Sequence, residues 1–570
     1  MIGDHFFGSQ SRRLGRALVA RPWLRAVAPA LALFSVSILL RLPFVSSALV
    51  NWDAVQFALA TRSFDLERHQ PHPPGYILYV SWGRVLSWVT GDPNLSFVLT
   101  SLVASSLSVA LLYQLGREMV GARTALVAAA LFATSPLLWY YSVVALTYAV
   151  EACFLLVVVW LCWRSLAPRP SPSPPASASL ILWSALALGL AGGVRQSTLV
   201  LILPLWLFAA ARAGQRPFWG GLAVLSATCL LWLAPLVYLS GGPVQYVTTG
   251  LDLLVFVGER TSVLYGGVGG VLENLAYVGA GLLIGLNLGL VVFLACLGGA
   301  ARVRLARRQW AILAVWGGPP MAVFVFGHTG QPGYLLLVLP ALCLLLALYV
   351  EALGQRLTRP LRLRPGVATT LMVAVLASAH VATVLVAPAT AHAILRDPIA
   401  AAMVDVRDND RFWDEVPAFV GRFNPEDVIL IAEASPWGSF RHAGYYLPNY
   451  RVYGLGNDRR GRFGWLFSAF RGSTNYSLEG LARARRLLPR PYDARFAIIL
   501  DPQLARTLVQ RELLVETIAT PYRSIYVLDL ARVEVMSFAY GQTFLHGPTL
   551  ESRETIPLAI RDLRLHADPE

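Results

Sequence analysis

Long apolar runs, each close to the length that crosses a lipid bilayer as an α-helix, recur along most of this chain. A helix needs about 20 consecutive apolar residues to span the hydrocarbon core. The composition agrees, since 56% of the 570 residues are hydrophobic and 14% are charged, against about 45–50% and about 25% in soluble domains. About eleven spans are predicted, near residues 26–47, 95–116, 124–142, 148–166, 180–197, 198–211, 219–239, 275–299, 309–326, 334–355 and 367–388. The fold class is therefore that of an α-helical polytopic membrane protein.

The last third of the chain differs from the rest, because residues 399–570 mix charged and apolar residues in ordinary proportions. Segments with helical character (DEVPAFVGRF and LEGLARARRLL) alternate with segments typical of strands (DVILIAE, FAIILD and RSIYVLDL). Such alternation predicts an α/β unit with a largely parallel sheet. We expect two domains: a membrane region over 1–398, with its first outer loop at 48–94, and a soluble α/β domain over 399–570.

The basic residues give the orientation of the helices. All 47 are arginine, which suggests a GC-rich genome and a bacterial inner (plasma) membrane. Arginines cluster in every second link between spans, which places those links and the N-terminus in the cytoplasm. An odd number of spans then makes residues 399–570 extracytoplasmic. Because the arginines lie between apolar segments, the net charge of +14 does not indicate nucleic acid as a partner.

The first outer loop carries the most informative pattern. It begins NWDAVQFALATRSFDLE and continues RHQPHPPGYILYVSWGRVLSWV, which predicts two short amphipathic helices joined by a Pro-rich turn. Its aromatic residues suit a segment in the lipid headgroup layer; they are Tyr76, Tyr79, Trp82 and Trp88. Asp53 is then expected just outside the membrane, where a lipid-bound substrate presents its head group. The alternative is that Asp53 caps the helix that follows it.

Two short motifs in this loop resemble a known family. DAVQFALA, from Asp53 to Ala60, and HPPGY at 72–76 are similar to the first-loop signature of glycosyltransferase C-fold (GT-C) enzymes, in particular the protein O-mannosyltransferase and lipid A aminoarabinose transferase group. The resemblance implies transfer of a sugar from a polyprenyl phosphate carrier on the outer membrane face. It also implies that Asp53 acts in catalysis and that the anomeric configuration is inverted.

Elementary chemistry is consistent with those roles. A carboxylate in a partly desolvated cleft accepts the proton of an attacking hydroxyl, and a departing phosphate requires nearby positive charge. Arg195, in AGGVRQST between two apolar pieces, and Arg260, in VGERTS, are the candidate phosphate ligands. A charge at the position of Arg195 is unfavourable unless it is paired or functional, whereas Arg260 has the alternative of pairing with Glu259.

Glu151 lies at the outer end of the fourth predicted helix, one turn after Tyr148, and resembles the second acidic position of the same fold. It has three alternatives: a metal ion, sugar hydroxyls, or a pair with Arg195. The sequence specifies no cofactor and no set of metal ligands. A divalent metal ion is the one candidate cofactor.

The remaining candidates lie in outer links. His72 either contacts the sugar donor or helps to build the HPPG turn. His328, Gln331 and Tyr334 lie together in FGHTGQPGYLLLVLP, where related enzymes carry a polar turn against the carrier phosphate. For Tyr334 the alternative is an aromatic residue of the membrane interface.

The sequence thus predicts an inverting glycosyltransferase that moves a sugar from a polyprenyl phosphate to a hydroxyl group on the outer face. The acceptor is a cell-envelope glycan, a lipid or a protein, and the other partners are the sugar donor and membrane lipid. A multi-pass transporter or flippase is the main alternative, although its ionisable residues would line a path through mid-bilayer and here they gather at the outer helix ends. A non-catalytic membrane scaffold is the third reading.

Overall fold

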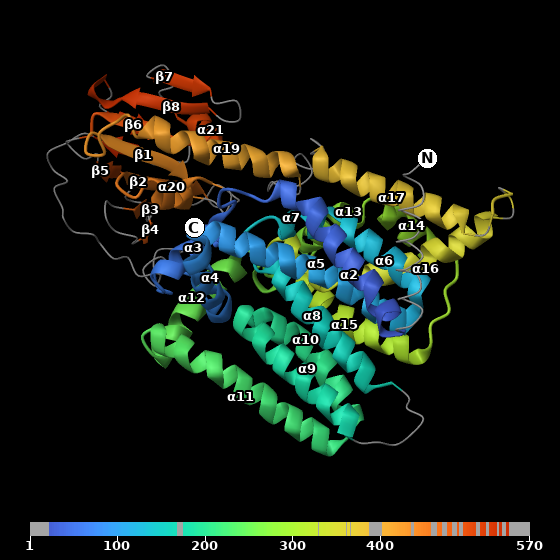
Figure 1. Cartoon of the computed structure of the whole chain (residues 1–570). Helices are drawn as coiled ribbons and strands as arrows, with labels where there is room; N and C mark the ends of the chain where they lie inside the picture. Colours follow the sequence, from blue (N-terminus) through green and yellow to red (C-terminus); the bar gives the residue numbers. More distant parts are fainter. Residues whose placement is uncertain are drawn as a thin grey trace, which may run out of the picture. The chain divides into compact units, whose positions relative to one another are not determined.

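The computed structural model describes residues 22–545, except for gaps at 168–174, 329, 359, 361, 365, 387–401, 435–437, 458–463, 470–475, 481–486, 490–493, 509–513, 520–523, 533–534 and 538–542. The chain (Figure 1) divides into two compact units. The membrane unit comprises Met1–Val45, Val98–Leu233 and Val257–Met403, and the loop unit comprises Ser46–Phe97, Ala234–Phe256 and Val404–Glu570. The two domains predicted from the sequence, residues 1–398 and 399–570, stay a prediction.

The membrane unit confirms the predicted helical class. Within the described residues, ten helices are long and apolar enough to cross a membrane, and eleven if the bent pair α6 and α7 forms one span. The helices are α2 (Pro22–Arg41), α5 (Pro93–Val120), α6 (Ala122–Thr134), α7 (Pro136–Ser142), α8 (Tyr148–Ser165), α9 (Pro175–Val194), α10 (Gln196–Ala213), α11 (Gln215–Leu239), α13 (Val263–Leu286), α14 (Leu288–Leu297), α15 (Arg307–Phe326), α16 (Leu339–Thr358) and α17 (Val367–Leu385). Two 3₁₀ helices, η1 (Leu42–Phe44) and η2 (Pro332–Leu337), complete it.

Burial separates central from peripheral helices. Inside its apolar window, 72% of α8 is buried, compared with 17% of α2 and 22% of α11. Large apolar side chains on peripheral helices, such as Leu39 on α2 and Leu231 on α11, are therefore exposed. Such exposure is unfavourable in water and neutral in lipid. The chain is an integral membrane protein, and α8 is the helix around which a buried site is built.

One predicted outer loop is largely helical. Hydropathy leaves residues 240–274 between two spans, but the structure has α12 (Pro243–Thr261) there and begins α13 at Val263. Along α12 the exposed side chains Val244, Val247 and Leu251 recur at helical spacing, and Gln245 and Tyr246 bond to Glu67 and to the carbonyl of Pro74. An amphipathic helix of this kind has too low an average hydropathy to be recognised as a span.

The loop unit contains the two helices predicted for the first outer loop, α3 (Trp52–Arg62) and α4 (Ile77–Thr90). The aromatic side chains between and along them do not share one environment. Tyr76 and Tyr79 are buried against Phe57, whereas Trp82 and Trp88 are exposed. The expectation of four interfacial aromatics is therefore wrong for the two tyrosines, because their rings fill the space between α3 and α4.

The C-terminal part packs against this loop. Asp410 on α19 (Met403–Val420) accepts hydrogen bonds from the hydroxyl of Ser46 (2.7 Å) and the amides of Ser47 (3.1 Å) and Ala48 (3.0 Å). The carbonyl of Leu49 accepts from Asn409 at 3.0 Å. The residues just before α3 are therefore held by side chains that lie 360 to 364 positions later in the sequence.

The sheet of the loop unit is mixed. Its strands are β1 (Val428–Glu433), β2 (Arg451–Asn457), β3 (Gly464–Ala469), β4 (Tyr476–Gly480), β6 (Phe496–Ile499), β7 (Leu514–Ala519) and β8 (Ser524–Asp529), in the order β4-β3-β2-β1-β6-β8-β7. A smaller sheet joins β5 (Leu487–Pro489), β10 (Thr543–Leu545) and β9 (Val535–Ser537). The short helices are α20 (Phe440–Tyr446), α21 (Pro502–Arg506) and the 3₁₀ helix η4 (Leu530–Arg532).

Two expectations for this part are wrong. The sheet is not largely parallel, because β1 pairs in parallel with β2 and β6 while the other four pairings are antiparallel. The links β2–β3 and β7–β8 are short, and short links favour hairpins over parallel crossovers. The segment LEGLARARRLL, predicted as a helix, has its first three residues in β4 and its last two in β5, and residues 481–486 lie outside the described residues. The described ends obtain their backbone hydrogen bonds from neighbouring strands, which overrides local helix propensity.

Candidate functional site

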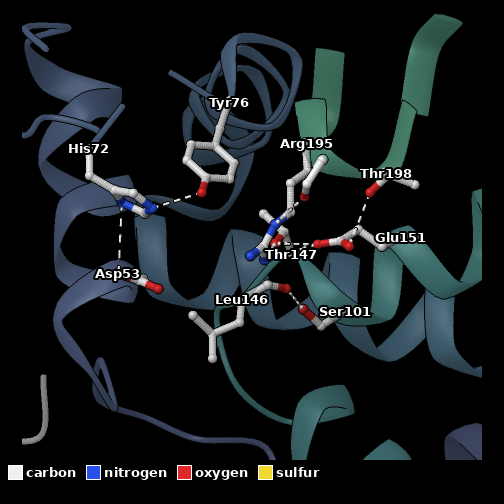
Figure 2. Close-up of polar contacts among 10 residues, drawn as sticks. Asp53, His72, Tyr76, Ser101, Leu146, Thr147, Glu151, Arg195 and Thr198 are labelled. Atoms are coloured by element: carbon white, nitrogen blue, oxygen red, sulfur yellow. Dashed lines mark hydrogen bonds and ion pairs between the residues drawn. The ribbon is translucent and has the colours of Figure 1, made fainter. Parts of the chain in front are cut away.

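A buried ion pair joins α8 to the start of α10 in the membrane unit (Figure 2). Nη1 of Arg195 lies 3.0 Å from Oε1 of Glu151, and the two side chains are 7% and 2% exposed. Arg195 is the N-cap residue of α10, in an extended conformation (φ −155°) at the break between α9 and α10. The break in the helix therefore points a guanidinium at the first turn of α8.

Hydroxyl groups donate the remaining hydrogen bonds to the carboxylate of Glu151. Thr147 donates to Oε1 (3.0 Å), and Thr198 donates to Oε2 (3.0 Å). Arg195 also donates from Nη1 to Thr147 and from Nε to Ser197, both at 3.2 Å. Every carboxylate oxygen of Glu151 thus accepts a hydrogen bond, as a buried carboxylate requires. These threonines and the serine were missed by sequence reasoning, although each lies within four residues of a predicted site residue.

Two tyrosine rings enclose the guanidinium. Its Cζ lies 4.6 Å from the ring centre of Tyr148 and 4.5 Å from that of Tyr334, and the rings meet edge to face. Gly333 permits this packing, because a Cβ there would lie 2.5 Å from Cγ of Tyr148 and 2.8 Å from Cζ of Tyr141. The alternative of a purely interfacial Tyr334 is thus inconsistent with its contact with Arg195.

The other predicted residues of this unit are less closely joined. The ring of His328 lies 5.9 Å from that of Tyr334, and Gln331 is the N-cap residue of η2. Arg260 lies in α12, and its side chain is outside the described residues. The structure therefore brings together Glu151, Arg195, Tyr148 and Tyr334, with His328 beside them.

A second group surrounds Asp53 in the loop unit (Figure 2). Oδ1 of Asp53 lies 3.7 Å from Nδ1 of His72, and the side chains are 28% and 15% exposed. Nε2 of His72 lies 2.8 Å from the hydroxyl of Tyr76. Asn51, not Asp53, caps α3 by accepting from the amide of Ala54 at 3.1 Å. The capping alternative for Asp53 is therefore wrong, and its carboxylate lies in the first turn beside an imidazole.

The turn that carries His72 has unusual backbone geometry. His69 (φ 55°) and Tyr76 (φ 45°) are both left-handed, which is unfavourable for residues with a Cβ. Such conformations persist where the surrounding structure imposes them and gather at functional sites. Burial, together with electrostatic interactions with Arg441 and His72, lowers the pKa of His69 to about 3. His69 is therefore neutral at physiological pH.

A metal site is not formed by these residues alone. Within the described part of the chain, no group of three or more His, Cys, Asp or Glu side chains could hold a metal ion. Both oxygens of Glu151 accept hydrogen bonds from protein donors. Of its three alternatives, the pair with Arg195 is the one observed.

Comparisons with known proteins relate part of this polytopic membrane protein to glycosyltransferases. The family model described as the protein O-mannosyl-transferase TMEM260 N-terminal domain matches residues 59–216. This match confirms the resemblance to the protein O-mannosyltransferase group and includes α8, Glu151 and Arg195. Residues 59–216 are thus related to a glycosyltransferase domain. No curated protein matches the chain.

Several solved structures are similar in fold. The crystal structure of ArnT from Cupriavidus metallidurans in the apo state is 15% identical, with a TM-score of 0.48, and the match covers 90% of this chain and 98% of that one. The same protein bound to undecaprenyl phosphate is 14% identical, with a TM-score of 0.48, and covers 89% and 97%. An oligosaccharyltransferase from Archaeoglobus fulgidus, in complex with Zn and sulfate, is 12% identical, with a TM-score of 0.46, and covers 83% and 68%.

Proposed function

We propose that this protein is an inverting glycosyltransferase that moves a sugar from a polyprenyl phosphate carrier to a hydroxyl acceptor on the outer face of the membrane. The observation that carries the proposal is the position of Asp53. Its carboxylate is 28% exposed, is not used to cap α3, and lies six residues before a segment that matches an O-mannosyl-transferase domain. A carboxylate placed in this way is suited to proton transfer with a bound substrate.

In the proposed reaction, Asp53 accepts the proton of the acceptor hydroxyl as that oxygen attacks the anomeric carbon. The bond from the anomeric carbon to the phosphate oxygen breaks, and polyprenyl phosphate leaves with the bonding electrons. One displacement inverts the anomeric configuration. The proton remains on Asp53 until it passes to solvent, so charge and atoms balance.

Arg195 is the proposed phosphate ligand. Its guanidinium stays charged at any physiological pH and is fixed in direction by Glu151, Thr147 and the two tyrosine rings. Preorganised positive charge stabilises a leaving phosphate without further rearrangement. Glu151 then orients Arg195, and the rings of Tyr148 and Tyr334 pack against its guanidinium.

The remaining predicted residues take supporting roles in this proposal. His72 positions the carboxylate of Asp53. Arg260, His328 and Gln331 contribute to binding of the carrier phosphate. A convergence of Asp53 and Arg195 on one cavity stays a prediction.

Orientation belongs to the same proposal. Residues 46–49 bond to Asp410, Asn409 and Tyr446 of the C-terminal part, which supports a common side for the first loop and residues 404–570. Cysteines placed at Ser63 and Glu426 in a cysteine-free background are expected to react with an impermeant maleimide from outside. A cysteine at Arg304 is expected to react only after permeabilisation. Labelling of Ser63 and Glu426 from opposite sides would contradict the arrangement.

The catalytic proposal is tested by Asp53→Asn, which keeps the shape of the side chain and removes its basicity. The measurement is the release of polyprenyl phosphate from a panel of polyprenyl-phosphate monosaccharides, mannose included, by the protein in liposomes with cell-envelope extract as acceptor. Loss of a general base lowers the rate by about 10²–10⁴-fold. Binding of the carrier is expected to survive, because Arg195 is unchanged.

Asp65→Asn is the matched control. Asp65 lies in the same loop, has the same 28% exposure as Asp53, and pairs with Arg68 at 3.1 Å. A surface pair of this kind contributes about 0–1 kcal/mol to stability, so the variant should transfer sugar at close to the wild-type rate. Asp53→Asn protein that folds and transfers at the wild-type rate would eliminate the proposed base.

A further inference from the structure

A line of buried polar side chains connects the C-terminal part of the chain to the imidazole beside Asp53. Arg441 on α20 is 3% exposed and lies over the ring of Trp52, with its Cζ 4.7 Å from the ring centre. Gln56 on α3 is also 3% exposed and lies between Arg441 and His72. All of these residues belong to the loop unit.

The orientation of the Gln56 amide follows from its neighbours. A guanidinium has only donors, so the amide oxygen must face Arg441, where it accepts from Nε and Nη1 at 3.2 Å each. The amide nitrogen then faces His72 and lies 2.5 Å from Nδ1. The reverse orientation would place NH₂ against guanidinium donors, which no proton arrangement can satisfy.

The same logic extends to the imidazole. Because the amide nitrogen donates to Nδ1, that ring atom must be an unprotonated acceptor, and the proton of a neutral ring lies on Nε2. Nε2 then donates to the hydroxyl of Tyr76, 2.8 Å away. Each donor in this line therefore meets an acceptor.

We propose that Arg441 is a positioning residue for the site of Asp53: acting through Gln56, it selects the tautomer of His72 in which Nε2 carries the proton. The inference rests on the proposed function for the role of Asp53, whereas the tautomer itself does not. The C-terminal part thereby influences the first outer loop indirectly, through Gln56.

The selected tautomer matters for the carboxylate. Nδ1 is the ring nitrogen that lies within 4 Å of Asp53, at 3.7 Å from Oδ1, which is longer than a hydrogen bond. In the opposite tautomer Nδ1–H would direct its proton toward the carboxylate of Asp53 and compete there with the proton of the acceptor hydroxyl. The charged and titratable groups that face His72 are Asp53, His69, Tyr76 and, through Gln56, Arg441.

The same short helix also fixes the start of the loop. His442, next to Arg441, lies 3.0 Å from the carbonyl of Leu49 through Nε2, and the amide of Leu49 donates to the hydroxyl of Tyr446 at 2.9 Å. The ring of His442 stacks on Trp413 of α19. Arg441 is thus carried by an element whose position relative to α3 is set by bonds to the backbone before Asp53.

The decisive experiment replaces Gln56 by Glu in the full-length protein. A carboxylate of the same shape keeps its bond to Arg441 but offers only acceptors to His72, so the proton is expected to move to Nδ1. ¹⁵N chemical shifts of histidine-labelled protein in detergent distinguish protonated from unprotonated Nδ1. An ordinary hydrogen bond favours one tautomer by about tenfold in population, and kcat of transfer is expected to fall by about the same factor with the donor KM unchanged.

Two substitutions of Arg441 and one control complete the test. Arg441→Met removes the hydrogen-bond donors that fix the orientation of the Gln56 amide. Both tautomers of His72 should then be populated. Arg441→Lys retains a donor-only group and should preserve the wild-type spectrum. Gln503→Glu adds the same charge at an exposed position of α21 and should change neither spectrum nor kcat.

The outcomes separate this inference from the proposed function. An unprotonated Nδ1 in both Gln56→Glu and Arg441→Met would overturn the positioning role, whatever Asp53→Asn does. A tautomer that changes as expected in a protein whose Asp53→Asn variant is fully active would support the positioning of His72 and reject Asp53 as the base. If Gln56→Glu does not fold, the pair Arg441→Met and Arg441→Lys decides the question alone.

Discussion

The two carboxylates of interest, Glu151 in the membrane unit and Asp53 in the loop unit, have very different surroundings. Glu151 is 2% exposed and accepts from Arg195, Thr147 and Thr198. Asp53 is 28% exposed and lies beside an imidazole at 3.7 Å. A buried carboxylate that accepts from several protein donors is suited to hold an arginine, and a carboxylate that is partly exposed to solvent is suited to exchange a proton with a bound substrate. The difference indicates a structural role for Glu151 and is consistent with the proposed role of Asp53 as the base.

The largest effect on stability is expected from Glu151→Gln. Removing one charge of a buried pair leaves the other uncompensated, which reduces the free energy of unfolding by about 3–5 kcal/mol. Glu118→Gln is the matched control, because Glu118 pairs with Arg164 at 3.8 Å with side chains 27% and 49% exposed. That pair should contribute at most about 1 kcal/mol. Thermal unfolding in detergent measures both, and equal shifts would remove the structural distinction between Glu151 and a surface carboxylate.

A smaller loss of stability, confined to the loop unit, is expected from Asp410→Ala. The variant leaves the amides of Ser47 and Ala48 without their acceptor, while the hydroxyl of Ser46 keeps the carbonyl of Ala48 at 2.6 Å. Unsatisfied donors of this kind reduce stability by about 1–3 kcal/mol. Hydrogen exchange should show faster exchange of the Ser47 and Ala48 amides. Asp414→Ala, one turn later and exposed, is the control. Unchanged protection of these amides would mean that Asp410 does not hold the loop.

Arg195→Lys is expected to weaken carrier binding without unfolding the membrane unit. Lysine retains the charge next to Glu151 but loses the planar stacking between Tyr148 and Tyr334, and cation–π contacts are worth about 0.5–2 kcal/mol each. The donor KM should rise about tenfold, as a loss of about 1.4 kcal/mol implies. Kinetics with a polyprenyl-phosphate sugar give the value. A donor KM equal to that of the wild type would argue against Arg195 as a phosphate ligand.

The smallest expected effect concerns pH and His69. Its pKa is lowered from 6.5 to about 3 in the folded protein, so between those values the unfolded chain binds the proton first. Stability therefore falls as the pH drops below about 6.5. His69→Gln should remove this contribution. Its unfolding temperature should fall by about 2 °C less than that of the wild type between pH 7.5 and 5.0. An unaltered pH dependence would place the acid-sensitive group elsewhere.

Much of the fold was predictable because hydropathy acts locally. Ten of the eleven predicted spans correspond to a helix or bent pair that is long and apolar enough to cross a membrane, since a bilayer selects length and apolarity alone. The span predicted at 275–299 instead covers the end of α13 and the short helix α14. The helix α12 was missed because its apolar side chains occupy one face. The antiparallel pairings of β3, β7 and β8 were missed because strand direction depends on link length and on partners distant in the sequence.

The sequence by itself determined which residues are chemically unusual: an arginine between two apolar segments, a glutamate at a helix end, and an aspartate before a Pro-rich turn. Only the tertiary structure decided their partners. Arg195 meets Glu151 because α9 breaks at residue 195, and Arg441 meets Gln56 because α20 packs on α3, 385 residues away in the numbering. Local pattern specifies solvent preference, whereas the pairing of buried polar groups is set by which donors and acceptors the folded chain brings within about 3 Å.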